Sequence, residues 1–171
     1  MTTKKTFLLA VAIPLLILLA MTIKPQATVL FGQEIVLETK AFDPTDLFRG
    51  DYVAISLAIS EIPKSKVTLS SDKVIGKNLY VGLKQEGKYY VVDQVSDIKP
   101  NKGVYLKGKF QETYNAINNA NQYRVDYSLD KYFIKEGSGG NLQQDSFRGD
   151  LVGTVKVLGG YGVVTGLAPR S

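Results

Sequence analysis

The chain has 171 residues, of which 44% are hydrophobic and 22% are charged, a composition that suits one globular domain with an appendage. It contains no cysteine, which excludes disulfides and thiolate metal sites, and no histidine, which removes the usual general base and metal ligand. The formal charge of +5 is spread thinly, without the basic runs and basic–aromatic clusters typical of nucleic-acid-binding proteins. We therefore expect no metal ion, no cofactor and no nucleic-acid partner.

An apolar segment near the N-terminus is long enough to cross a membrane. Residues 6–23 carry no charge and are apolar except at three positions, Thr6, Pro14 and Thr22. As a helix with a rise of about 1.5 Å per residue, this segment spans roughly 27 Å, which covers the hydrocarbon core of a bilayer. Lys4 and Lys5 precede it, so the positive-inside rule predicts a cytoplasmic N-terminus. We expect residues 1–25 to be a retained signal anchor and residues 26–171 to form an extracytoplasmic domain, periplasmic or at the cell surface.

A cleaved secretory signal is the alternative interpretation of this segment. Cleavage requires small residues at two positions, and the candidate sites at 20–22 and 25–27 meet this requirement poorly. A buried core helix is a further alternative, but such a helix usually has a polar face, and this segment has none. The retained anchor therefore remains the preferred interpretation.

Beyond Pro25 the sequence changes to short apolar runs with a period of two, separated by Gly, Pro, Asn and Asp, as in all-β domains. We expect seven or eight strands, within the segments 33–40, 53–60, 79–83, 89–95, 104–110, 123–129, 151–158 and 161–167. Residues 84–88 connect one hairpin, and Gly159 and Gly160 form a two-residue turn of the primed type. Residues 111–122 are expected to be a loop or a weak helix. Seven or eight strands in a domain of this length predict an antiparallel barrel or sandwich.

An octapeptide occurs twice, at 46–53 and again at 145–152, with only two of its eight positions changed. Each copy precedes an apolar, β-prone run, so the motif is interpreted as a turn that begins a strand. Nine residues of the two copies are candidate binding or structural residues: Asp46, Arg49, Gly50, Asp51, Tyr52, Asp145, Arg148, Gly149 and Asp150.

Two interpretations of these residues stay open. In the structural one, Gly50 and Gly149 adopt a backbone conformation that side chains disfavour, and the aspartate after each glycine accepts hydrogen bonds from backbone N–H groups. Each motif arginine then pairs with the aspartate three residues before it. In the functional one, both copies lie at one end of the barrel, where their Arg and Asp side chains line a small polar pocket for a ligand or another protein.

Residues 50–57 resemble the GDYXXLXY motif, which names an uncharacterised family of bacterial membrane-anchored proteins. Residues 43–49 are similar to the lead-in of that motif, and residues 104–109 and 127–137 are similar to later blocks of the family. Two positions depart from the motif, because Ile55 replaces its leucine and Leu57 its second tyrosine. The family has no assigned activity. Its members often occur beside or fused to multi-pass membrane proteins, so the resemblance implies a polytopic membrane-protein partner.

The sequence therefore predicts a single-span membrane protein whose exported β domain binds a partner and has no catalytic activity of its own. The alternative is a membrane-bound hydrolase, distantly like a signal peptidase, that uses Ser, Lys or Asp side chains near the two motif copies. A third hypothesis is ligand or carbohydrate binding on a face that carries Tyr105, Tyr123 and Tyr127. We expect these tyrosines to pack in or around the core instead.

Overall fold

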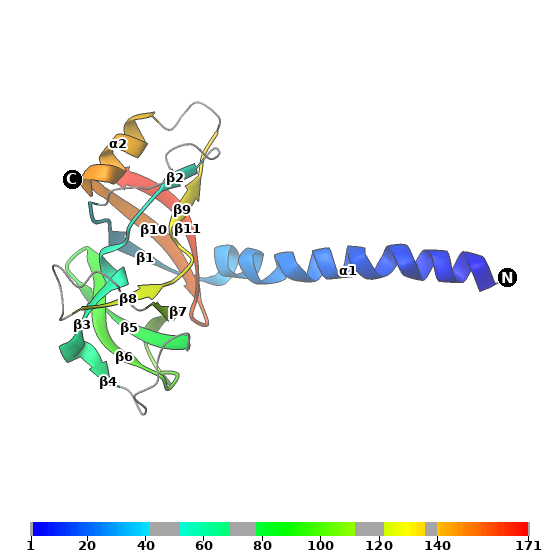
Figure 1. Ribbon diagram of the computed structural model, residues 1–171, viewed down its shortest axis with the longest axis horizontal. Coiled ribbons are helices and arrows are strands. Elements are labelled where there is room, and N and C mark those ends of the chain that lie inside the picture. Colours follow the sequence, from blue (N-terminus) through cyan, green and yellow to red (C-terminus); the bar gives the residue numbers. More distant parts are fainter. Residues whose placement is uncertain (1, 42–51, 69–77, 112–121, 136–139, 171) are drawn as a thin grey trace.

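The computed structural model describes residues 2–41, 52–68, 78–111, 122–135 and 140–170. A long helix, α1 (Thr2–Phe31), extends from a β domain that also carries a short helix, α2 (Gly140–Arg148) (Figure 1). The strands are β1 (Gln33–Glu38), β2 (Tyr52–Ala54), β3 (Glu61–Pro63), β4 (Val67–Thr68), β5 (Asn78–Glu86), β6 (Tyr89–Ser96), β7 (Val104–Gln111), β8 (Gln122–Asp126), β9 (Lys131–Phe133), β10 (Leu151–Leu158) and β11 (Tyr161–Pro169). Two 3₁₀ turns, η1 (Ala58–Ser60) and η2 (Lys64–Lys66), flank β3.

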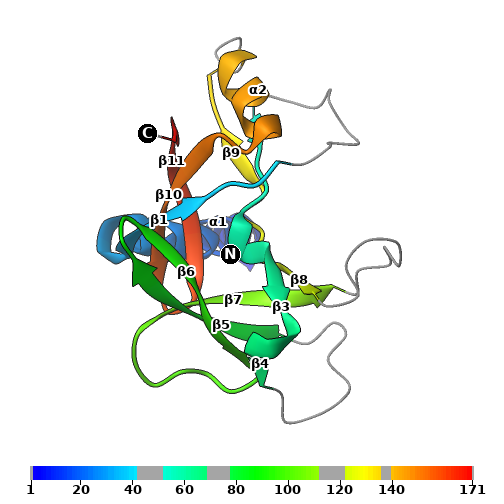
Figure 2. The same cartoon turned by 90° about the vertical axis from the view of Figure 1, so that its left-hand side faces the viewer.

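These strands form three sheets. The largest has the order β3-β8-β7-β5-β6-β4 and curves into a nearly closed barrel (Figure 2). Its strand pairs are antiparallel except for β4 and β6, which are parallel. A three-stranded antiparallel sheet has the order β1-β10-β11, and β2 pairs with β9. The prediction of an all-β domain with barrel-like architecture, preceded by one apolar helix, is confirmed.

Both predicted hairpins are present. Antiparallel strands β5 and β6 are joined at Gly87 and Lys88, and β10 and β11 are joined at Gly159 and Gly160. The second turn has φ values of 58° and 84° at its two glycines. Positive φ at both central residues defines the primed turn whose twist matches that of the flanking strands. The Gly-Gly pair therefore gave a reliable sequence signal.

The period-two pattern predicted burial better than it predicted strand length. Residues 53–60 were expected to form one long strand, but β2 ends at Ala54 and η1 follows. The alternate apolar side chains are nevertheless all buried, with exposed fractions of at most 4%: Val53, Ile55, Leu57 and Ile59. The backbone changes partners along this stretch, since the Ile55 N–H donates to the Asp130 carbonyl and the Ser56 carbonyl accepts from Lys40. This crossing between sheets keeps the alternation but interrupts the ladder.

Helix α2 was not predicted, and it includes the first four residues of the second motif copy. Its nine residues are largely polar, so the sequence has no apolar periodicity that would predict a helix here. Leu142 packs against the core cluster, and Ser146 is fully buried. The helix is thus held by tertiary contacts with the β domain more than by its own propensity.

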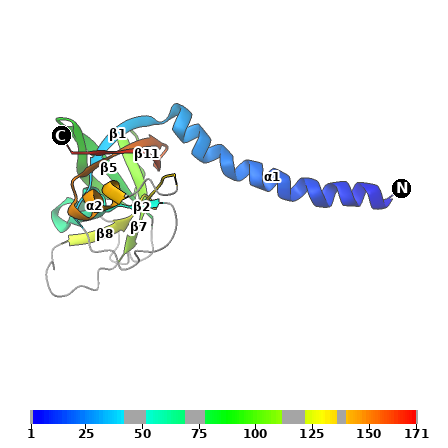
Figure 3. The same cartoon turned by 90° about the horizontal axis from the view of Figure 1, so that it is seen from above.

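Helix α1 points away from the domain (Figure 3). The large apolar side chains along most of its length are exposed. The stretch Lys4–Phe31 contains an 18-residue window with a mean hydropathy of 2.6, and it is long and apolar enough to be a membrane anchor or a signal sequence. Its last turns, in contrast, pack on β10 and β11. Thr28 is fully buried there, and its carbonyl accepts a 2.8 Å hydrogen bond from the Gly32 N–H. The end of α1 is therefore part of the β domain.

Candidate functional site

The second motif copy forms the end of α2 and the turn into β10. Gly149 has φ of 74°, a left-handed conformation that costs glycine little because it has no Cβ. Its N–H donates to the Ser146 carbonyl over 3.1 Å, and the Asp150 N–H donates to the Asp145 carbonyl over 3.0 Å. This pair of bonds is a recurrent helix C-cap and satisfies carbonyls that the helix itself leaves free. The copy is thus a helix-ending corner.

Two side-chain interactions were expected in the second copy, an ion pair between Arg148 and Asp145 and hydrogen bonds to the Asp150 carboxylate. The described residues show neither of them. Within the described residues, no ion pair joins Arg148 to Asp145, which lies three positions earlier. The described hydrogen bonds of Asp150 use its backbone, because its N–H donates to Asp145 and its carbonyl accepts from the Arg170 N–H. Backbone geometry, more than paired charges, accounts for the corner.

The second motif copy lies beside the described end of the first copy, Tyr52 and Val53 in β2. Ser146 of the second copy donates its hydroxyl to the carbonyl of Ala54, one residue beyond the first copy. Gly149 packs on the chain that leads toward the first copy, because a Cβ at this position would lie 2.4 Å from the Ala41 nitrogen. Helix α2 and β2 are neighbours at the upper end of the domain in Figure 1. The described part of the first copy therefore shares one end of the domain with the second copy.

Of the candidate residues in the first copy, Asp46, Arg49, Gly50 and Asp51 lie outside the described residues. Tyr52 begins β2, and its ring meets that of Phe133 edge-on, with 6.0 Å between the centroids. The Lys131 Nζ lies 5.1 Å from the centroid of the Tyr52 ring, within range of a cation–π interaction. Tyr52 therefore belongs to an aromatic–lysine cluster on β2 and β9.

A polar cavity of about 160 Å³ lies between the stretch that follows β2 and the end of β8. It is lined by Ile55, Ser56, Leu57, Ser60, Gln111, Arg124, Val125, Asp126, Tyr127, Leu129 and Asp130. Residues 55–57 end the first family-like block, and residues 127–130 begin a later one. Strand β7, which carries the third block, pairs with β8. Blocks that are distant in sequence thus converge around this cavity, whereas Asp145, Arg148 and Asp150 do not line it.

The two carboxylates that line the cavity, Asp126 and Asp130, differ in their hydrogen bonding. Asp126 accepts a 2.7 Å hydrogen bond from the Ser128 N–H and a 3.3 Å bond from the Gln111 amide. The first bond holds Ser128 at φ of 56°, a conformation that a short side-chain cap favours. Asp130 is exposed, and its carboxylate has no hydrogen bond or ion pair with any residue that the structure describes. Asp130 is therefore the carboxylate available for a ligand.

The hydrolase hypothesis requires a nucleophile and a base to meet at the cavity. Its lining includes the hydroxyls of Ser56 and Ser60, but none of the described residues that line it is a lysine. A serine–lysine pair of the kind that the hydrolase hypothesis invokes is thus not assembled at this site. Over the described ranges, no group of three or more acidic side chains is placed to hold a metal ion.

Tyr127 supports the cavity from the core side. Its hydroxyl donates a 2.9 Å hydrogen bond to the Ile59 carbonyl, and burial raises the pKa of its phenol well above the ordinary value of 10.0. The phenol therefore stays protonated and acts as a structural donor. Tyr105 is also buried, and Tyr123 packs on the core cluster, with its ring 5.0 Å from that of Phe110. The prediction that these three tyrosines pack in or around the core is confirmed.

We expect Tyr127→Phe to lower the free energy of unfolding by about 1 to 3 kcal/mol, because the Ile59 carbonyl loses its donor. The pH dependence has a definite sign. A folded-state pKa above the unfolded value near 10.0 contributes stability that is complete below about pH 10 and is lost as the pH rises further. Urea denaturation at pH 8 and at pH 10.5 measures both effects, and the variant should lose less stability than the parent between the two.

Tyr90→Phe is the matched control, because the Tyr90 hydroxyl makes only exposed hydrogen bonds, of 3.3 and 3.5 Å. It should change the stability at pH 8 by less than about 0.5 kcal/mol. If Tyr127→Phe and Tyr90→Phe show the same alkaline loss, the assigned role of the Tyr127 phenol is wrong.

Apart from Tyr127, the polar residues that line the cavity were not singled out from the sequence. Arg124, Asp126 and Asp130 belong to β8 and the turn after it, whereas Ser56 comes from a distant segment, and no periodic pattern links the two. The similarity of residues 127–137 to a later block of a known family was the signal that pointed to this region. The repeat drew attention to a corner that shapes the backbone.

Comparisons with known proteins agree with that resemblance. The family model described as GDYXXLXY protein matches residues 14–167. Comparison with curated proteins and with solved structures found no match. The matched range includes most of α1, both motif copies and all the strands of the barrel. The chain therefore belongs to the GDYXXLXY protein family.

Proposed function

We propose that this chain is a single-span membrane protein whose β domain binds a partner protein outside the cytoplasm, in the periplasm or at the cell surface. The exposed apolar surface of α1 supports its assignment as a membrane span, because exposing so much apolar surface to water would be unfavourable for a helix that extends away from its domain. Lys4 and Lys5 at the start of the helix support a cytoplasmic N-terminus.

Retention of the helix is supported by its packing on the domain. Lys24 lies over the Tyr161 ring, with its Nζ 4.3 Å from the ring centroid. Thr28 is fully buried, and a Cβ at Gly32 would lie 3.1 Å from the Val157 nitrogen. Cleavage at the candidate site after Ala27 would cut through this packed region. A retained anchor keeps it intact.

The observation that carries the binding proposal is the polar cavity with the free carboxylate of Asp130. At about 160 Å³ it is smaller than the roughly 300–1,000 Å³ of small-molecule pockets, so it suits a single side chain of a protein. A carboxylate beside two serine hydroxyls favours a cationic or amide side chain. A loop of a polytopic membrane protein, held close by the same bilayer, is the partner that we propose.

The test places a photo-crosslinking amino acid at Gln111, on the rim of the cavity, in cells that express the full chain. We expect a discrete crosslinked protein, and Asp130→Lys should reduce its yield at least tenfold. A lost charge-assisted bond corresponds to roughly tenfold to hundredfold in affinity. Asp93→Lys, an exposed change of the same charge on β6, should leave the yield unchanged.

A crosslinker at Glu86, on the β5–β6 hairpin away from the cavity lining, is the positional control. The same crosslinked protein from Glu86, or survival of the Gln111 crosslink in Asp130→Lys, would refute binding at the cavity. The competing hydrolase predicts a different result. Purified chain would then cleave a generic ester or peptide, and Ser56→Ala or Ser60→Ala would abolish turnover without changing stability.

A further inference from the structure

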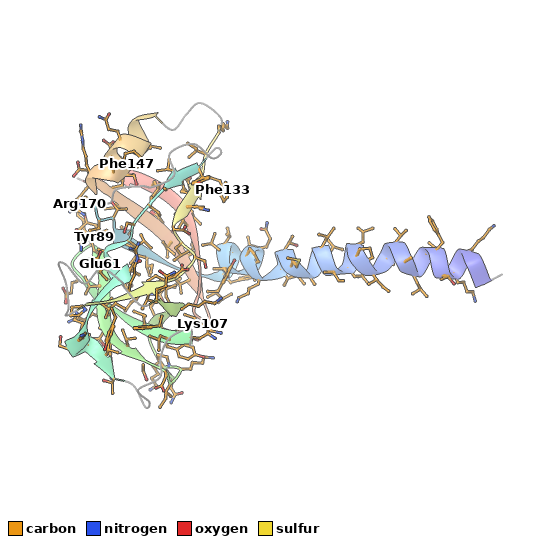
Figure 4. The ribbon with its side chains drawn as sticks, in the orientation of Figure 1. Glu61, Tyr89, Lys107, Phe133, Phe147 and Arg170 are labelled. Atoms are coloured by element: carbon orange, nitrogen blue, oxygen red, sulfur yellow. The ribbon has the colours of Figure 1, made fainter. Side chains whose placement is uncertain are left out.

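The side of the domain from which α1 leaves carries exposed aromatic and basic side chains. Figure 4 shows Phe133 and Lys107 on that side, whereas Tyr89, Glu61 and Arg170 lie on the other. Phe133 is 75% exposed, which is unusual for a large aromatic side chain in water. Covering this exposed ring with another apolar surface would therefore be favourable.

The first group on this face is built around the end of the anchor helix. Lys24 is the first charged residue after the apolar run, and it lies over the ring of Tyr161 at the start of β11. The hairpin that leads to Tyr161 is fixed to β7, because the Lys107 N–H donates a 2.7 Å bond to the Gly160 carbonyl. Helix end, hairpin and β7 thus form one unit at the boundary of the apolar segment.

The second group is the aromatic–lysine cluster on β2 and β9. Phe133 presents its ring beside Tyr52, and Lys131 lies over the Tyr52 ring. Tyrosine, phenylalanine and lysine are the residues that settle at a bilayer interface, where apolar rings meet the acyl boundary and ammonium groups reach lipid phosphates. Both groups thus combine aromatic rings with a lysine ammonium group.

We propose that this helix-side surface, made of Lys24, Tyr52, Lys107, Lys131, Phe133 and Tyr161, seats on the anionic headgroups of the bilayer that α1 spans. The inference rests on the membrane anchorage proposed above and is independent of the polar cavity. The packed end of α1 holds this face at the membrane boundary, and its lysines are complementary to lipid phosphate. Seated in this way, the domain has one fixed orientation on the membrane.

The chain contains no tryptophan, so a single introduced one gives an unambiguous fluorescence signal. The experiment uses the full chain in nanodiscs of phosphatidylglycerol and brominated phosphatidylcholine, in which the bromines quench nearby indole rings. Phe133→Trp should lose at least half of its emission relative to unbrominated discs. Tyr89→Trp, an aromatic replacement on the opposite side, should lose less than a tenth (Figure 4).

Two further variants separate the possible outcomes. Leu16→Trp, in the middle of α1, reports on the anchor and should be strongly quenched. In the Phe133→Trp background, Lys131→Glu combined with Lys107→Glu should restore most of the emission, whereas Lys88→Glu, on the β5–β6 turn, should not.

If the Leu16→Trp variant is quenched and the Phe133→Trp variant is not, the docking inference is overturned while the anchorage stands. An unquenched Leu16→Trp variant would overturn the anchorage and the docking together. If the Phe133→Trp variant stays quenched after Lys131→Glu and Lys107→Glu are added, the inference that these lysines recognise headgroup charge is overturned.

Discussion

Replacing Gly149 with alanine is expected to lower the free energy of unfolding by about 2 to 5 kcal/mol, which would move the unfolding midpoint down by roughly 10 °C. Two costs add at this position. The left-handed backbone, with φ of 74°, disfavours any side chain, and the new methyl group would lie 2.4 Å from the Ala41 nitrogen. Thermal unfolding of the full chain in detergent, followed by circular dichroism, measures the shift.

Gly87→Ala is the matched control for this prediction. Gly87 has a similar φ of 63°, but a Cβ added there would meet no atom within 4 Å. It should therefore show only the conformational cost of about 1 to 2 kcal/mol. Equal destabilisation by the two substitutions would mean that the contact of the corner with residues 40–41 contributes nothing to stability.

Gly32→Ala is expected to disrupt the junction between α1 and the β domain, at a cost of about 2 to 4 kcal/mol. A Cβ at this position would lie 2.3 Å from the Thr28 carbonyl oxygen and 3.1 Å from the Val157 nitrogen, both backbone atoms that cannot move aside cheaply. Relief requires the helix end to leave β10. We therefore expect a lower midpoint in urea and faster proteolysis after Lys24.

Gly166→Ala, on β11, is the control for the junction. Its added methyl group would make ordinary contacts of 3.7 and 3.8 Å with Thr154, so stability should change by less than about 0.5 kcal/mol. Unchanged proteolysis at the junction in Gly32→Ala would show that the helix end is not held on the domain. The proposed seating of the domain on the bilayer would then lose its structural basis.

The fold class could be predicted because the period of strands and the length of an apolar helix are visible directly in the sequence. The buried alternation Val53, Ile55, Leu57 and Ile59 was predicted correctly even where no regular strand forms. The Gly-Gly turn at 159–160 was equally clear. Helix α2 could not be predicted, since its nine residues depend on Ser146 and Leu142 meeting the rest of the domain.

The candidate site was predictable only in part. The repeat correctly marked a place where the backbone turns sharply, and the positive φ explains why Gly149 cannot be exchanged freely. The charged residues of the second copy do not line the cavity. Ser56 and Asp130 meet at the cavity only because the Ile55 N–H bonds the Asp130 carbonyl, a pairing between segments far apart in the chain.

The sequence by itself determined that an apolar N-terminal helix precedes an all-β domain, because hydrophobic periodicity and charge are local properties of the chain. Only the tertiary structure decided which polar groups stay free, as at Asp130, and which face of the domain lies beside the helix. Both depend on which distant backbone segments form hydrogen bonds with one another, and local pattern carries no record of that choice.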